Sequence, residues 1–229
     1  MNICIIPARG GSKRIPRKNI RKFAGKPMIE WSISAAIKAN CFDRIIVSTD
    51  DMEISNFAES IGAEVPFKRP LYLSEDYTPT GDVVKHALDW LKLQEILKTN
   101  VCCLYATAPF VTSSDICQSL SLLNPLVCDF VLPVTSYTFP VQRALVISEN
   151  TKLLEMREPA EFSSRSQDLK ESFHDAGQFC WGSAEAWISS DTPFQRKTLP
   201  YNLPRSRVQD IDTNEDWDRA ELLHKLLYE

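Results

Sequence analysis

A glycine-containing loop rich in basic residues lies close to the N-terminus. It follows a short apolar run, residues 3–6, which has the length and composition of a buried β-strand. Gly10 and Gly11 allow backbone amides to approach phosphate oxygens, and basic side chains can neutralise phosphate charge. The loop is therefore a candidate site for a multiply charged anion such as a nucleoside triphosphate. Residues 3–26 contain no Asp or Glu, and their basic residues are Arg9, Lys13, Arg14, Arg17, Lys18, Arg21, Lys22 and Lys26.

Other kinds of basic segment share this composition. The loop has neither the G-x-x-x-x-G-K-[ST] pattern nor the G-x-G-x-x-G pattern, so a P-loop and a dinucleotide-binding turn both lose support. A solvated basic loop and an arginine-rich targeting peptide remain alternatives, because both also lack acidic residues. A targeting peptide is dispensable for folding, whereas this segment begins with an apolar run that is typical of a core strand. We therefore favour the anion-binding hypothesis.

Two acidic residues near the C-terminus, Asp210 and Asp212, are candidates for a metal site. Residues two apart on an extended segment project from the same face, so both carboxylates can point outward while Ile211 points into the core. Two carboxylates beside bound phosphates suit Mg²⁺, with water and phosphate oxygens as the other ligands. The alternative is a pair of solvated carboxylates before a helix N-terminus, where negative charge is favourable in any case.

The composition limits the class of protein. With 229 residues, of which 44% are hydrophobic and 24% charged, we expect one α/β domain spanning residues 1–229. A net charge of −4 with one basic patch argues against a nucleic-acid partner. No apolar run approaches the roughly 20 residues that span a bilayer, so we expect no membrane contact. The seven cysteines lack metal-type spacing, which favours reduced thiols and a cytoplasmic location.

Apolar segments and helical patterns alternate along the first part of the chain. This alternation predicts a mainly parallel sheet with helices on both faces, and ligands of such sheets bind beyond the carboxyl ends of the strands. The loop after the first strand lies at that edge. Strands are expected at residues 3–6, 44–48, 63–67, 101–105 and 129–134, and helices at residues 27–37, 52–61, 81–93 and 115–123, the last capped by Ser113 or Ser114.

The pattern changes at about residues 135–175, where the chain is polar and helix signals are poor. We expect an arm inserted in the domain, with a hairpin and a dimer contact. Residues 174–181 should return to the sheet as a strand. The extended residues 207–212 then precede a C-terminal helix, for which Thr213 and Asp216 form an approximate capping box.

Two motifs resemble a known family. Residues 7–19, P-A-R-G-G-S-K-R-I-P-R-K-N, are similar to the N-terminal signature of the cytidylyltransferases that activate nine-carbon acid sugars with CTP, namely the CMP-sialate synthetases and their pseudaminate and legionaminate relatives. Residues 208–213, V-Q-D-I-D-T, resemble the metal-binding D-x-D motif of that family. The resemblance implies a Rossmann-like nucleotide-diphospho-sugar transferase fold, Mg²⁺ as cofactor, CTP and an acidic nine-carbon sugar as substrates, and a homodimer in which the arm completes the sugar pocket of the partner.

The resemblance also implies roles for residues on the CTP side. Arg69, in a loop that is similar to the cytosine-binding loop of the family, matches an arginine that can donate to O2 and N3 of the base. Asn19 matches a ribose-contacting position, and Thr80 either reaches the base or only caps its helix. Arg14, Arg17, Arg21 and Lys22 are expected to be surface or supporting charges. The residues expected at the triphosphate are Ala8, Arg9, Gly10, Gly11, Ser12, Lys13 and Lys18, and those expected to be catalytic are Arg9, Lys18, Asp210 and Asp212, with the two aspartates as metal ligands.

The sugar side differs from the sialate enzymes. Tyr105 stands where those enzymes have a glutamine, and Val111 replaces a nearby arginine, which indicates a changed sugar pocket. Tyr105 alternatively only packs on the core. Residues 174–177, H-D-A-G, resemble the pseudaminate enzymes, although a lone histidine such as His174 is equally often structural. An arginine of the arm can clamp the sugar carboxylate. The sugar-binding candidates are Tyr105, Arg143, Arg165, Gln167, His174, Asp175 and Gln178.

These observations together favour a CTP-dependent cytidylyltransferase for an acidic nine-carbon sugar, most similar to the pseudaminate enzymes. The nearer alternative is the same reaction on legionaminate, sialate or 3-deoxy-octulosonate. The more distant alternative is a non-catalytic nucleotide-binding module. The retention of Arg9, Lys18, Asp210 and Asp212 argues against that module, because a protein freed from catalysis has no need of the acidic pair.

Overall fold

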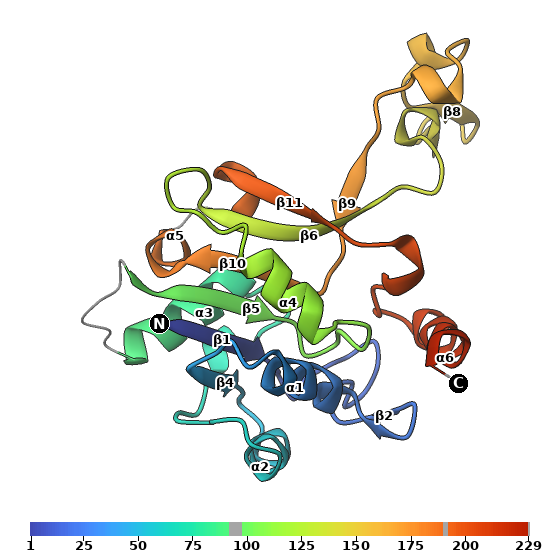
Figure 1. Cartoon of the computed structure of the whole chain (residues 1–229). Coiled ribbons are helices and arrows are strands. Elements are labelled where there is room, and N and C mark those ends of the chain that lie inside the picture. Colours follow the sequence, from blue (N-terminus) through green and yellow to red (C-terminus); the bar gives the residue numbers. More distant parts are fainter. Residues whose placement is uncertain (92–97, 190–191, 229) are drawn as a thin grey trace.

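A computed structural model describes residues 1–91, 98–189 and 192–228, which are arranged around one central sheet (Figure 1). The strand order is β11, β6, β10, β5, β1, β4, with β9 paired to β6. Five strands run in one direction, and β9 and β10 run against them. The predicted α/β fold with a mainly parallel sheet is therefore confirmed. The bounds are β1 Asn2–Pro7, β4 Arg44–Ser48, β5 Asn100–Leu104, β6 Phe130–Ser136, β9 Phe173–Asp175, β10 Phe179–Ser183 and β11 Thr198–Asn202.

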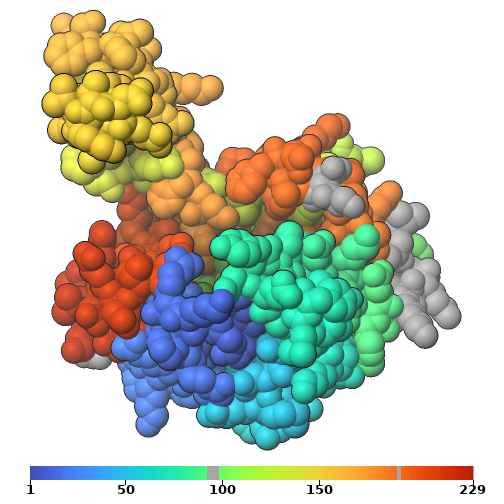
Figure 2. All heavy atoms as spheres, turned by 180° about the vertical axis from the view of Figure 1, so that it is seen from behind, coloured from blue at the N-terminus to red at the C-terminus, as the bar shows by residue number. Residues whose placement is uncertain are grey.

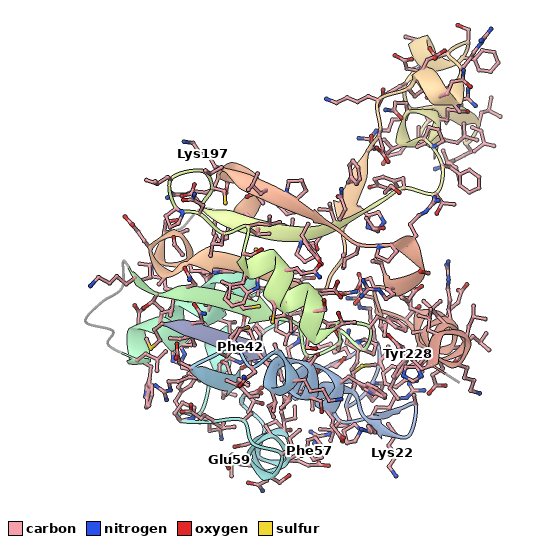
Figure 3. All side chains as sticks on the ribbon, in the orientation of Figure 1. Lys22, Phe42, Phe57, Glu59, Lys197 and Tyr228 are labelled. Carbon is pink, nitrogen blue, oxygen red and sulfur yellow. The ribbon has the colours of Figure 1, made fainter. Side chains whose placement is uncertain are left out.

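Helices cover both faces of the sheet because alternate strand residues point to opposite sides. On β1, Cys4 and Ile6 pack in the same buried cluster as residues of α1, α2 and α4. Ile3 and Ile5 pack instead with residues of α3 and α5. Phe42, labelled in Figure 3, stacks on Trp181 with ring centroids 5.2 Å apart. The helix bounds are α1 Met28–Ala39, α2 Met52–Ser60, α3 Thr80–Leu91, α4 Ser113–Leu120 and α5 Ala184–Ile188.

The C-terminal helix α6, Asn214–Tyr228, packs against the basic N-terminal segment (Figure 2, red against blue). The guanidinium of Arg21 lies 4.4 Å from the ring centroid of Trp217 and donates to Asn214. The predicted capping box is present, since Asp216 N–H donates to Thr213 Oγ1 and Thr213 N–H donates to Asp216 Oδ2. The two ends of the chain therefore form one unit. A third apolar cluster holds it together, comprising Ile15, Phe23, Met28, Phe110, Ile211, Trp217 and Ala220.

Three local predictions need correction. Residues 174–181 form two strands instead of one, because Gly177 has a φ of 64° and donates its N–H to Asp175 Oδ1, which turns the chain between β9 and β10. Residues 63–67 form a single isolated bridge, from Glu64 to Ile46 of the edge strand β4, in place of the predicted strand. Helix α4 is capped by Thr112, one residue earlier than expected. The predicted helix 81–93 begins at Thr80, and its last two residues lie outside the described part of the chain.

A protruding segment leaves the sheet after β6 and returns at β9, in the region where the sequence predicts an arm. It contains a hairpin of β7, Leu145–Ile147, and β8, Leu154–Met156, and it stands away from the body of the molecule (Figures 1 and 2). A smaller hairpin, β2 Lys22–Phe23 and β3 Lys26–Pro27, precedes α1. Within the ranges that the structure describes, no helix has the length and apolar character needed to cross a membrane.

Candidate active site

A cavity of about 590 Å³ opens at the carboxyl ends of β1 and β5, where Pro7 and Tyr105 contribute to its wall. This is the sheet edge at which ligands of doubly wound folds bind. It brings together residues from the N-terminal loop, the loop before α3 and the segment before α6. Of the residues predicted from the sequence, Arg9, Ser12, Lys13, Lys18, Asn19, Arg69, Thr80, Tyr105 and Asp212 line this cavity.

The N-terminal loop is held in place by the carboxylates that follow β4. The N–H of Gly10 donates to Asp50 Oδ1 at 3.1 Å. The expectation that this amide binds an anion is therefore wrong for this structure, because the amide already has an acceptor. A Cβ atom on Gly10 would lie 2.6 Å from Asp51 Oδ2, which makes glycine necessary at this position. Arg17, with a φ of 57°, pairs with Asp51 and Glu53, in agreement with its expected supporting role. Ala8 is buried, and no atom lies within 4 Å of the Cβ position of Gly11.

Two basic residues of the cavity share one carboxylate. Arg9 Nη1 lies 2.8 Å from Asp76 Oδ1, and Lys13 Nζ lies 2.6 Å from Asp76 Oδ2. The hydrogen bond from Lys13, together with the charge of Arg9, lowers the pKa of Asp76 below its usual value. All three side chains are partly or largely exposed, so this arrangement can be exchanged for a bound anion at little cost.

Lys18 connects the N-terminal loop to the acidic pair. Its Nζ donates to the carbonyl oxygen of Ile211 at 2.7 Å and lies 3.6 Å from Asp212 Oδ1. Burial lowers the pKa of Lys18, and the charges of Asp212 and Asp210 oppose that effect. Arg14, expected as a surface or supporting charge, lines the cavity and donates to Asp212 Oδ1 at 2.9 Å.

The acidic pair fits a divalent cation in its chemistry. Burial and the negative charge of Asp212 raise the pKa of Asp210, and a cation between the two carboxylates would relieve this repulsion. Among residues 1–91, 98–189 and 192–228, no group of three or more His, Cys, Asp or Glu side chains is placed to hold a metal. The protein would thus supply two carboxylates, and phosphate oxygens and water would complete the coordination.

Arg69 is a buried cation with unused hydrogen-bond donors. Only 3% of its surface is exposed, and its Nε and Nη2 have no hydrogen-bond partner, since the nearest carboxylate oxygen, Asp50 Oδ1, lies 3.6 Å from Nη2. Burial lowers its pKa. Unpaired buried donors are costly unless a ligand satisfies them. Asn19 and Thr80 line the same cavity; Asn19 donates to the carbonyl of Arg9, and Thr80 is the first residue of α3.

The expected sugar-side residues divide into two groups. Tyr105 lines the cavity, and burial raises its pKa, with Asp175 and Asp210 among the charges that contribute. Burial, followed by the charge of Asp210, also raises the pKa of Asp175. Gln178 is almost fully buried, and its Nε2 donates to the carbonyl of Arg207 at 2.6 Å. His174 contacts the carbonyl of Asp175 and the ring of Tyr137, away from the cavity wall.

The second group lies on the arm, outside the cavity of its own chain. Arg143 donates to the carbonyl of Ser164 at 2.5 Å, and the side chain of Arg165 is exposed. Gln167 lines a separate cavity of about 320 Å³ at the base of the arm. The arm projects away from the sheet edge (Figure 1), so these side chains do not join the residues on β1 and β5 within one chain.

Sequence reasoning missed the acidic residues that organise the cations. Asp50 and Asp51 follow a predicted strand, and Asp76 lies in the predicted cytosine loop, but all three carry only an ordinary signal of polar loop residues. Their significance depends on which cations the fold places beside them. The sequence offered one clue to Asp50 and Asp51, namely that the loop carrying them follows a predicted strand at the carboxyl edge of the sheet.

Comparison with known proteins identifies relatives along the whole chain. The sequence matches the family model described as "Cytidylyltransferase" over residues 3–202. It is 42% identical over 228 residues to a pseudaminic acid cytidylyltransferase of Campylobacter jejuni, covering 100% of this chain and 98% of that protein. It is 31% identical over 231 residues to a CMP-N,N'-diacetyllegionaminic acid synthase of Legionella pneumophila, covering 98% and 96%.

A solved structure has the same fold. The structure of a CMP:2-keto-3-deoxy-manno-octonic acid synthetase complexed with CTP matches with a TM-score of 0.70 and covers 99% of both chains. Its sequence identity is 15%, so this likeness concerns the fold alone.

The contacts of Asp76 predict a gain in anion binding when its charge is removed. In Asp76→Asn, Arg9 and Lys13 lose their carboxylate partner, so inorganic pyrophosphate should bind about twofold to fivefold more tightly in a calorimetric titration. Glu75→Gln is the matched control, because it removes the same charge from the cavity wall without breaking a contact to either cation. Equal or weaker binding by Asp76→Asn relative to this control would contradict the interpretation.

Proposed function

This chain belongs to the cytidylyltransferase family, and from that premise we propose that it transfers CMP from CTP to pseudaminic acid. In this reaction a sugar hydroxyl oxygen forms a bond to the α-phosphorus of CTP, the bond from that phosphorus to the leaving oxygen breaks, and pyrophosphate and the hydroxyl proton are released. The observation that carries the proposal is the cavity that holds Arg69 together with Arg9, Lys13 and Lys18. Donors for a base and cations for a triphosphate are thereby present in one site.

The basic residues suit the triphosphate. Arg9 and Lys13 are exposed enough to exchange Asp76 for phosphate oxygens, and Lys18 lies deeper, beside the acidic pair. Positive groups that are already in place stabilise the charge that develops on the transferring and leaving oxygens. We assign Arg9 and Lys18 to that catalytic role, with Ser12 and Lys13 binding the phosphates.

Arg69 suits a cytosine ring. Its free Nε and Nη2 donors complement O2 and N3 of cytosine, both of which are acceptors. In uracil N3 carries a hydrogen, so the same donors would leave one buried pair unsatisfied. Thr80 and Asn19 line the cavity near this arginine, and we assign them to the base and the ribose.

We propose that Asp210 and Asp212 hold a Mg²⁺. When bound, this ion supplies positive charge to the phosphate oxygens. Arg14 and Lys18 place positive charge beside Asp212 Oδ1, and these contacts keep the carboxylate oriented towards the cavity.

Several features support pseudaminic acid among the acidic sugars. Tyr105 presents an aromatic ring to the cavity, where the related sialate enzymes have a glutamine, and the buried Val111 removes a cation. Asp175 is the last residue of β9, and Gln178 lies on the turn before β10, where its carbonyl oxygen accepts from the backbone N–H of Tyr105. The relative from Campylobacter jejuni acts on this sugar, according to its name.

We further propose a homodimer in which the arm supplies residues to the partner's sugar pocket. Arg143, Arg165 and Gln167 would then act in the neighbouring subunit, which explains their distance from the cavity of their own chain. The arm exposes apolar side chains that a partner can cover, namely Leu145, Ile147 and Leu154 of the hairpin and Phe162 beyond it. Light scattering that gives the mass of one chain at micromolar concentration would contradict this arrangement.

A cytoplasmic location is part of the same proposal. All seven cysteines are free thiols in the structure, and a reducing compartment maintains such thiols. Labelling with a thiol reagent after denaturation of the protein from its native host would test this point; disulfide-linked cysteines would contradict it.

The sugar assignment predicts the outcome of a substrate panel. With CTP and Mg²⁺, pyrophosphate release should occur with pseudaminate and be slow or absent with legionaminate, sialate and 3-deoxy-octulosonate. Mass spectrometry should identify CMP-pseudaminate as the product. Preference for another acid would overturn the sugar assignment, and no release with any of them while CTP still binds would favour a non-catalytic nucleotide-binding module.

The acidic pair predicts a loss of turnover. The double variant Asp210→Asn, Asp212→Asn keeps the side-chain shapes but removes both charges, so kcat should fall on the order of 100-fold or more. The thermal unfolding midpoint should change little. Asp218→Asn, an exposed position on α6, is the control and should retain full activity. Retained turnover in the double variant would show that these aspartates are not the metal ligands.

A further inference from the structure

The segment between β11 and α6 needs contacts from other elements to define its position. It carries Asp210 and Asp212. Among the described residues 203–213, one short 3-10 turn forms, Arg205–Arg207. Pairing with the sheet ends at Asn202, and beyond it one backbone hydrogen bond, from Leu203 N–H to the carbonyl of Val134, joins the segment to β6. At its far end, Ile211 is buried and its carbonyl accepts from Lys18. Backbone hydrogen bonds to a neighbouring strand therefore do not set where the two aspartates lie.

Arg207 is the charged anchor between these two ends. Its guanidinium forms two bonds to the carboxylate of Asp115 on α4, with Nη1–Oδ2 at 2.5 Å and Nη2–Oδ1 at 3.1 Å. Its backbone carbonyl accepts from Gln178 at 2.6 Å. Arg207 is thus held by its side chain on one element and by its main chain on another, three residues before Asp210.

Asp115 is built into the fold as an acceptor for this arginine. Only 4% of its surface is exposed, and its carboxylate also accepts from Thr112 Oγ1 and from the hydroxyl of Tyr201. Burial alone would raise the pKa of Asp115, but the bonds from Arg207 and Thr112 outweigh it and lower the pKa. Both oxygens of the buried carboxylate are therefore satisfied, and loss of Arg207 would leave a buried charge without its cation.

The anchored segment lies against the turn at Gly177, which follows Asp175. A Cβ atom placed on Gly177 would be 3.8 Å from Asp210 Oδ1. A small displacement of Arg207 would therefore change the distance between Asp210 and the turn at residues 175–178. Neither Asp115 nor Arg207 lines the cavity, so either residue would affect the reaction through others, namely the aspartates of this segment and Gln178, which donates to the carbonyl of Arg207.

We propose that the Asp115–Arg207 ion pair is a positioning device that sets the placement of Asp210 and Asp212, and thereby the affinity of the site for a divalent cation and the rate of transfer. Both residues act through the aspartates and touch no reacting atom. The inference rests on the proposed function where it assigns the aspartates to a metal, whereas the placement of the segment can be measured without any turnover.

Arg207→Gln tests the proposal, because it removes the cation and leaves Thr112 and Tyr201 to support Asp115. Amide hydrogen exchange should become faster in peptides covering residues 204–212 and remain unchanged in peptides from β1 and β5. The affinity for Mn²⁺ in the presence of CTP, read from the free-ion electron spin resonance signal, should fall about 10-fold to 100-fold. kcat should fall by a similar factor, and KM for CTP should change less than kcat, since Arg9, Lys13 and Arg69 pair with Asp76 and Asp50, which lie outside this segment.

Further variants test whether the effects belong to the Asp115–Arg207 ion pair. Arg44→Gln breaks a similar arginine–carboxylate pair, with Glu64, at the opposite edge of the sheet, and should change none of these quantities. Asp115→Asn combined with Arg207→Gln should be no worse than the more damaging single change, because both remove the same interaction. If Asp115→Asn fails to fold, Arg207→Gln and Arg207→Lys remain informative, and Lys should restore part of the Mn²⁺ affinity.

The outcomes separate this inference from the proposed function. Unchanged exchange at residues 204–212 and unchanged Mn²⁺ affinity in Arg207→Gln would overturn the inference, as would equally faster exchange throughout the sheet. If the wild-type protein shows no transfer to any acid sugar, the proposed function fails, yet the exchange measurement still decides whether the ion pair positions the aspartates.

Discussion

The ammonium group of Lys18 holds together two parts of the chain that are 193 positions apart. It donates to the carbonyl of Ile211 and lies beside Asp212, while the side chain of Ile211 packs with Ile15 from the N-terminal loop. A polar contact on one side and an apolar cluster on the other therefore fix the distance between the basic N-terminal loop and the acidic pair. Because nucleotidyl transfer depends on placing phosphates and cations in register, the remaining site geometry depends on this contact.

The cations of the site are balanced in two different ways. Arg17 and the loop at Gly10 are bound to Asp51 and Asp50, contacts that shape the loop. Arg9 and Lys13 share the exposed Asp76, a contact that phosphate can replace. Asp76 therefore keeps the side chains of Arg9 and Lys13 oriented without a bound anion. If phosphate oxygens replace this carboxylate, as we propose, the two side chains need little rearrangement on binding.

Much of the fold follows from local sequence patterns. The apolar runs at β1, β4, β5 and β6 predict buried strands, and the pattern of Thr213 and Asp216 predicts the start of α6, because both depend on residues close together in the chain. The turn at Gly177 was missed because a glycine between two extended segments is compatible with a continuous strand. The family was recognised from two motifs, residues 7–19 and 208–213, and that recognition is confirmed.

The candidate site was only partly predictable. Arg9, Lys18 and Arg69 were identified by resemblance, and they lie together in one cavity, but their roles remain predictions. The partners Asp76 and Asp115 were not identified, because Asp115 meets Arg207 across 92 positions and such pairs are chosen by tertiary structure. The sugar-side roles of Arg143, Arg165 and Gln167 also remain predictions, because the arm places these residues away from the cavity of their own chain.

We propose that the buried guanidinium of Arg69 selects cytosine in the cavity that also holds Arg9, Lys13 and Lys18. Calorimetric titration of CTP and UTP into the wild-type protein and into Arg69→Lys, which keeps the charge but loses the planar pair of donors, tests it most directly. The wild-type protein should bind CTP about 10-fold or more tightly than UTP, and Arg69→Lys should bind both with similar affinity. Equal binding of CTP and UTP by the wild-type protein, or undiminished discrimination in Arg69→Lys, would contradict it.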